Sequence, residues 1–195
     1  MKEQPASFYT GFLNKIRSIH SLSEDGERKL LDCVRIRHIE KNDSLLNPDQ
    51  VCKNIYFIEQ GFARSLCFNK SKEINLNFHL KGDFVTNLTS LRNGTPSKYE
   101  IQMTEKSVVL SFEKQTLQQL YEVSLEIACF GRMLLEQLLA EQEEQTNLFK
   151  LKTPAERYAF LLKSRPLLFQ KATLSQIASY IGVSRETLSR IRGRK

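Results

Sequence analysis

Residues 173–195, TLSQIASYIGVSRETLSRIRGRK, contain two short helical patterns that meet at Gly182. Thr173 is a residue type that caps helices, and Gln176 follows it at the spacing of a capping box. Gly182 tolerates a left-handed backbone, and Ser184 beyond it can cap a second helix. The apolar spacing sets one group of residues inward: Ile177, Ala178, Ile181, Val183, Leu188 and Ile191. The stretch therefore predicts a helix-turn-helix.

The second of these helices has a basic, polar face. Five residues cannot share the inward face with Leu188 and Ile191 and are expected to face solvent: Arg185, Glu186, Ser189, Arg190 and Arg192. From residue 150 onward, eleven lysines and arginines stand against two glutamates, whereas the preceding residues sum to −2. Such asymmetry is typical of a nucleic-acid-binding end. A plain helical hairpin is the alternative, which arginines interleaved with apolar residues disfavour.

Composition excludes several classes of protein. The chain has 195 residues, enough for one large domain or two small ones. It contains no long apolar run and no signal-peptide pattern at its start, so we expect a cytoplasmic protein without a membrane partner. The cysteines are scattered and are expected to be free thiols: Cys33, Cys52, Cys67 and Cys129. The histidines are isolated too, at His20, His38 and His79, so no metal, cofactor or enzymatic activity is expected.

The middle of the chain reads as short strands separated by turn residues. The predicted strands are Val34–Ile39, Leu45–Leu46, Asn54–Gln60, Ala63–Asn69, Glu73–Leu80, Tyr99–Thr104 and Ser107–Glu113. This spacing is typical of an antiparallel roll. In Glu73–Leu80, alternation predicts Ile74, Leu76, Phe78 and Leu80 on one face and Asn75, Asn77 and His79 on the other. Between Gly82 and Pro96 the pattern stops, which indicates either a long loop or a short helix starting near Thr86–Leu88.

Helical patterns flank the roll. Residues 7–35 predict two helices, the first with the apolar stripe Phe8, Phe12, Ile16 and Ile19. After a short helix near Leu117, a helix of about 25 residues follows, ~37 Å long. One face of this helix is predicted to carry Ile127, Phe130, Leu134, Leu138, Gln142, Gln145, Leu148 and Phe149. This helix packs on the roll, pairs with a second copy, or does both. A capping box at Thr153 then starts a helix over residues 154–164.

The chain resembles the Crp/Fnr family of transcription regulators over nearly its whole length. The resemblance rests on three segments: Tyr56–Arg64, Gly82–Phe84 and Ile181–Ile191. It implies an α+β fold with an N-terminal antiparallel β-roll (the cyclic-nucleotide-binding-like double-stranded β-helix), a dimerisation helix and a helix-turn-helix domain. The expected domains are residues 1–124, 125–151 and 152–195.

The resemblance also implies partners and contacts. They are a two-fold site in double-stranded DNA, a homodimer, RNA polymerase and a small-molecule effector whose identity stays open. The family's base-contacting positions match Arg185, Glu186 and Arg190, and arginine to guanine and glutamate to cytosine are the pairings that their geometry favours. Four further residues are expected at the DNA: Ser189, Thr173, Ser184 and Arg192.

Two departures from the family pattern stand out. The family's ligand pocket corresponds to Thr86, Asn87, Leu88, Ser97, Lys98, Gln142 and Glu143. The glutamate and arginine that hold a cyclic nucleotide fall on Asn87 and Ser97, so we do not expect a response to cyclic AMP. Few residues follow Ile191, so most of the usual β-hairpin wing is expected to be absent.

Two other functions are less consistent with the sequence. A ligand-binding adaptor would use its terminal helices to contact protein, and would then expose apolar anchors where Arg185 and Arg190 stand. A cupin-like metalloenzyme would need clustered histidine and glutamate ligands, which the three separated histidines do not supply.

Overall fold

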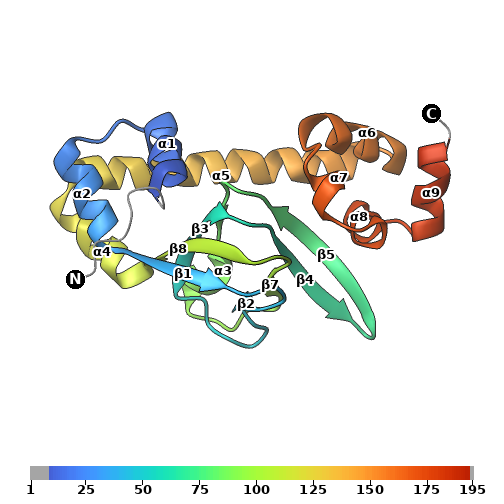
Figure 1. Cartoon of the computed structure of the whole chain (residues 1–195), viewed down its shortest axis with the longest axis horizontal. Helices are drawn as coiled ribbons and strands as arrows, with labels where there is room; N and C mark the ends of the chain where they lie inside the picture. The colour runs from blue at the N-terminus through green and yellow to red at the C-terminus, as the bar shows by residue number, and fades with distance from the viewer. Residues whose placement is uncertain (1–8, 194–195) are drawn as a thin grey trace.

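The computed structural model describes residues 9–193 and shows a β-roll lying beneath one long helix (Figure 1). The strands are β1 Val34–Ile39, β2 Ser44–Leu46, β3 Asn54–Gln60, β4 Ala63–Asn69, β5 Lys72–His79, β6 Phe84–Val85, β7 Glu100–Met103 and β8 Ser107–Glu113. They form two antiparallel sheets, in the orders β1-β8-β3-β6 and β2-β7-β4-β5. The predicted α+β roll is confirmed.

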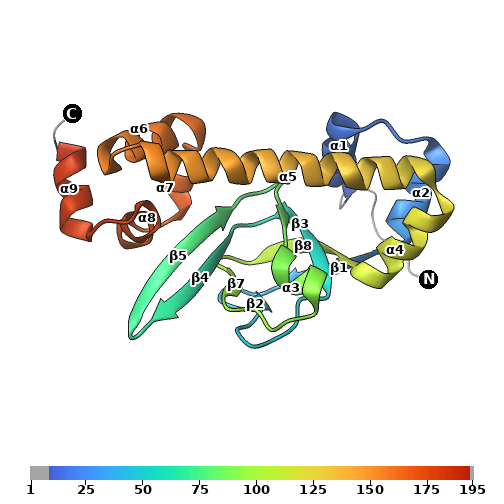
Figure 2. The same ribbon diagram turned by 180° about the vertical axis from the view of Figure 1, so that it is seen from behind.

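The helices lie mostly outside the roll. They are α1 Thr10–Ile19, α2 Glu24–Asp32, α3 Leu88–Asn93, α4 Lys114–Val123, α5 Leu125–Leu151, α6 Pro154–Ser164, α7 Leu168–Lys171, α8 Leu174–Ile181 and α9 Arg185–Gly193. Both views place α1, α2 and α4 at one end of α5 and α6 to α9 at the other (Figures 1 and 2). The expected N-terminal stripe is buried at Phe12 and Ile16, while Phe8 lies outside the described residues.

Two details of the predicted strands need correction. A two-residue strand, β6, was missed inside the interruption, where Val85 pairs with Tyr56. The expected alternation along β5 is wrong at its centre, because Asn75 is buried and the Leu76 side chain is 39% exposed. The register shifts there: Ser65 faces Asn77 but the next residue of β4 faces Asn75, so Leu76 is a bulge that reverses the faces. Of the two readings of the interruption, the short helix is the correct one, as α3.

The segment Tyr56–Arg64 joins the roll to its surroundings. The buried Glu59 carboxylate accepts the backbone N–H groups of Gly11 and Phe12 at 3.0 and 2.9 Å, and so holds the start of α1. Gly61 has a φ of 124°, and a Cβ there would collide with Ser107. Strand β3 therefore positions α1 through Glu59, and the turn at Gly61 allows the close approach to Ser107.

The long helix α5 buries one face and leaves another open. Its 27 residues correspond to ~40 Å of helix. Ile127, Phe130 and Leu134 are buried against α1, α2 and α4, as the apolar spacing predicted. Farther along the predicted face, Gln142 is exposed. Beyond Leu138 the helix leaves this core, and its next buried residue, Leu148, packs in the C-terminal helical region.

Capping residues and a glycine turn set the ends of the C-terminal helices. Thr153 and Thr173 both form complete capping boxes, at the starts of α6 and α8. Gly182 adopts a φ of 80°, and the Ser184 hydroxyl accepts the N–H of Thr187 to cap α9. The predicted helix-turn-helix geometry is therefore present, with Ile177, Ile181 and Leu188 buried between its helices.

His79, near the end of β5, makes the stability of the fold depend on pH. Burial, and next the charge of Arg165, lower the pKa of His79 from 6.5 to about 3, and its Nε2 lies 2.9 Å from the Ser65 hydroxyl. The unfolded chain therefore binds an extra proton between these pKa values. The His79 contribution is fully present above pH ~6.5 and is lost as the pH falls, by at most about 1.4 kcal/mol per pH unit. Urea unfolding at pH 7 and 5.5 should show a smaller loss for His79→Gln than for the unmodified protein; parallel pH profiles would contradict this assignment.

Candidate nucleic-acid interface

The exposed face of α9 gathers the residues that the sequence assigned to DNA. Arg185, Glu186, Ser189, Arg190 and Arg192 are all exposed, whereas Leu188 is fully buried. Thr173 and Ser184, which cap α8 and α9, are exposed as well. Arg194 and Lys195 lie outside the described residues. The structure thus places all seven predicted residues on one helix-turn-helix at the far end of α5 (Figure 1).

The electrostatics of this face suit base edges that both donate and accept hydrogen bonds. The pKa of Glu186 lies below its ordinary value, because the carboxylate accepts hydrogen bonds from its own backbone N–H and from the side chain of Ser184. It is therefore an ionised acceptor at neutral pH. Arg190 donates one hydrogen bond to the Thr187 hydroxyl at 3.2 Å, which orients its guanidinium along the helix. Arginine donors beside a carboxylate acceptor can distinguish G·C from A·T pairs in the major groove.

Two of the predicted ligand-pocket positions in the roll, Asn87 and Ser97, bond to each other. The Asn87 amide donates to the Ser97 hydroxyl at 2.7 Å, and its carbonyl oxygen accepts the N–H of Ser90. Ser97 in turn donates to the carbonyl of Tyr99 at 2.6 Å. Asn87 and Ser97 are 5% and 1% exposed. The two side chains predicted to occupy the ribose and phosphate positions are thus buried and paired with each other.

The remaining pocket positions are not brought into this network. Leu88 and Lys98 are exposed, and Thr86 donates to the carbonyl of Asn54. Gln142 and Glu143 lie exposed on α5. No hydrogen bond or ion pair found among residues 9–193 links either of them to Asn87 or Ser97.

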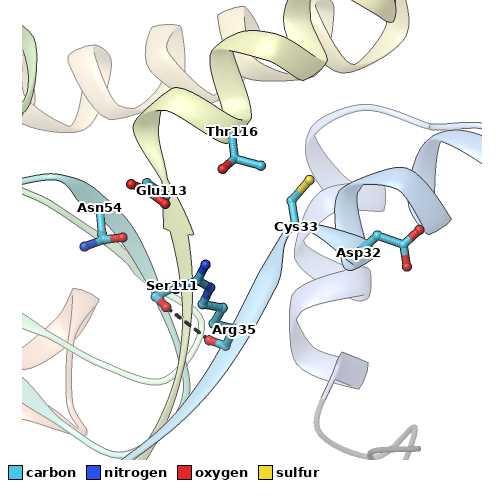
Figure 3. Close-up of a pocket in the computed structure, with 7 residues that line it drawn as sticks. All are labelled: Asp32, Cys33, Arg35, Asn54, Ser111, Glu113 and Thr116. Atoms are coloured by element: carbon cyan, nitrogen blue, oxygen red, sulfur yellow. Dashed lines mark hydrogen bonds between the residues drawn. The ribbon is translucent and has the colours of Figure 1, made fainter. Parts of the chain in front are cut away.

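A separate cavity of about 130 Å³ opens between the α2–β1 and β8–α4 junctions (Figure 3). It is lined by Asp32, Cys33, Arg35, Asn54, Ser111, Glu113 and Thr116. The Ser111 hydroxyl donates to the carbonyl of Arg35 at 3.1 Å, and the Asp32 carboxylate turns away from the other side chains (Figure 3). Burial raises the pKa of Cys33, so its thiol stays protonated. This cavity lies toward the opposite end of α5 from α9 (Figure 1).

Between residues 9 and 193, no three His, Cys, Asp or Glu side chains cluster in a way that could hold a metal ion. None of the helices described in that range has the length and apolar character needed to cross a bilayer.

Comparison with known proteins agrees with this architecture. Residues 36–124 match the model of the cyclic nucleotide-binding domain family. The chain therefore contains a domain of this type, and as a whole it has the fold of the Crp/Fnr regulators, with a roll, a long helix and a C-terminal helical region. No curated protein matches it in sequence.

Solved structures match over most of the chain. FixK2 from Bradyrhizobium japonicum is 19% identical with a TM-score of 0.67, and the match covers 83% of each chain. A putative transcriptional regulator of the Crp/Fnr family from Eubacterium rectale is 15% identical with a TM-score of 0.67, covering 96% of this chain and 86% of that one. The Thermus thermophilus catabolite activator protein is 19% identical with a TM-score of 0.57, covering 92% and 85%. These likenesses establish the fold.

Proposed function

We propose that this chain is a homodimeric, sequence-specific DNA-binding transcription regulator of the Crp/Fnr type that does not respond to cyclic AMP. The observation that carries the proposal is the exposed face of α9, where Arg185, Glu186 and Arg190 project around a buried Leu188. A short helix with such side chains fits the major groove and can bond base edges there. The basic charge concentrated after residue 150 supplies the attraction to phosphate.

The adaptor function is less well supported by the same face. Within residues 174–193, none of the large hydrophobic side chains is exposed. A protein-binding helix would need apolar or aromatic anchors there. The charged side chains that stand in their place favour DNA.

The dimer is supported by a second face of α5. Leu125, Leu135 and Leu139 are 80%, 42% and 61% exposed, and their spacings of ten and four residues, at ~100° per residue, place them within about 80° on one side of the helix. This side is distinct from the one that Ile127 and Leu134 bury. An apolar stripe from Leu125 to Leu139, ~21 Å at 1.5 Å per residue, fits the same stripe of a second copy. Two copies joined there would present two recognition helices to a two-fold DNA site.

DNA binding is tested by selecting sequences from a random double-stranded pool with the purified full chain. We expect the selected sequences to converge on a motif with two-fold symmetry. A pool that stays random after several rounds, with binding that depends only on salt, would contradict sequence-specific recognition.

Cyclic nucleotides are expected to leave the protein unaffected. The pocket positions Asn87 and Ser97 are occupied by their mutual hydrogen bond, and neither can replace a guanidinium as a partner for a phosphate. A ligand with a Kd of ~10 μM, present at ~1 mM, would stabilise the folded state by about 2.7 kcal/mol. We therefore expect no shift in the unfolding temperature with cyclic AMP or cyclic GMP at this concentration, with adenosine as the control. A saturable increase with either cyclic nucleotide would show that the network opens to admit a ligand.

A further inference from the structure

The edge of β5 is covered by side chains of the helical C-terminal region. β5 ends the sheet β2-β7-β4-β5, so one row of its backbone groups has no neighbouring strand. The Ser179 hydroxyl of α8 accepts the N–H of Asn75 at 3.0 Å and donates to the carbonyl of Glu73 at 3.2 Å. One hydroxyl thus pairs with two groups of the strand edge, as a further strand would.

Arginine and glutamine side chains bond to the same strand farther along. Arg165, between α6 and α7, donates from Nη2 to the carbonyl of Phe78 and to the Asp83 carboxylate, both at 3.1 Å. Gln145 of α5 donates to the Tyr180 hydroxyl at 3.1 Å and approaches the carbonyl of the Leu76 bulge at 3.4 Å. The β-bulge at Leu76 therefore lies within the contact between β5 and the C-terminal part of the chain.

Apolar side chains also pack between the roll and the helix-turn-helix. Phe62 and Phe78 of the roll belong to one buried cluster with Ile177, Tyr180 and Leu188 of the helix-turn-helix. The rings of Phe78 and Tyr180 lie 5.3 Å apart, edge to face. Leu188, the buried anchor of α9, thus packs in a core to which the roll contributes.

We propose that Ser179 and Arg165 are positioning residues that hold the helix-turn-helix on the β5 edge in its DNA-reading orientation. The inference rests on the proposed DNA-binding function and adds what fixes the orientation of α9. Thr173, Arg185 and Arg190 stay exposed while α8 is docked, so the docked arrangement leaves the reading face open. A helix-turn-helix released from β5 would sample many orientations about the junction at residues 152–153. Only the fraction of dimers in which both helix-turn-helices had the correct orientation could occupy both half-sites. The apparent affinity for the operator would therefore fall.

The test replaces the docking hydroxyl in the full chain. Ser179→Ala removes both bonds to β5, and operator binding is expected to weaken about tenfold in fluorescence anisotropy. Hydrogen exchange at the Asn75 amide should become faster in the same variant, because its acceptor is gone. Ser179→Thr keeps the hydroxyl and should restore both properties. Ser164→Ala, in the same region, loses a hydroxyl that bonds only to the Phe160 carbonyl of its own helix and should bind like the unmodified protein.

A second variant lies in the roll, away from any DNA. Asp83→Asn removes the charged partner of Arg165 while keeping an acceptor for the Leu80 N–H, and should weaken operator binding a few-fold. Unchanged or tighter binding by Ser179→Ala would overturn the inference, as would unchanged exchange at Asn75. If the unmodified protein selected no operator at all, the proposed function itself would fail, which separates the two results.

Discussion

Arg185→Ala is expected to remove most of the discrimination between the selected operator and random DNA. Arg185 occupies the first turn of α9 on its exposed face, where a guanidinium can donate two hydrogen bonds to one guanine. Each lost base contact costs ~1–3 kcal/mol, and two copies act on a two-fold site, so specific binding should fall by roughly 30-fold or more. Competition binding at fixed salt, with operator and random duplexes, measures the effect.

The control for this variant is Arg28→Ala. Arg28 is an exposed arginine on α2, where it pairs with Asp25 at the other end of the molecule. Arg28→Ala should leave the affinity for the operator and the affinity for random DNA unchanged. If Arg185→Ala weakened operator and random DNA equally, Arg185 would contact phosphate alone, and the base-reading role would be wrong.

Leu139→Glu is expected to convert the dimer to a monomer. Leu139 is 61% exposed in the single chain and lies in the apolar stripe on α5, near the middle of that helix. In a two-fold pair this substitution sets two carboxylates against each other in an apolar seam, which desolvates like charges. The monomer would bind one half-site at a time, so operator affinity should fall by roughly 10²–10⁴-fold through lost avidity. Sedimentation velocity and operator binding measure the two effects.

Leu167→Glu is the matched control for this substitution. Leu167 is 52% exposed beside α7 and lies outside the α5 stripe. The Leu167→Glu protein should remain dimeric and should bind the operator with the affinity of the unmodified protein. A Leu139→Glu protein that sediments as a dimer would place the subunit interface elsewhere.

Much of the fold was predictable because local rules and tertiary structure agree. The capping boxes at Thr153 and Thr173 and the left-handed Gly182 are encoded within a few residues, and the structure contains all three. Four strands, β1, β3, β4 and β8, have the predicted bounds for the same reason. The exposure of Arg185 and Arg190 followed from helical periodicity around Leu188.

The misses have a common physical cause, because each depends on a contact distant in sequence. The bulge at Leu76 arises where β5 meets Ser179 and Gln145, about 70 to 100 residues later. Ser179 and Arg165 carried no local signal, since a serine in a helix and an arginine in a loop are ordinary surface residues until β5 lies beside them. The hydrogen bond between Asn87 and Ser97 is the exception, because both residues were already predicted to line the same ligand pocket.

Two copies of α9 are expected to read one two-fold DNA site. Hydroxyl-radical footprinting of the full chain on its selected operator measures this. We expect two protected half-sites related by symmetry, with centres ~34 Å apart along one face of the duplex. A single protected half-site, or protection unchanged by Arg185→Ala, would contradict it.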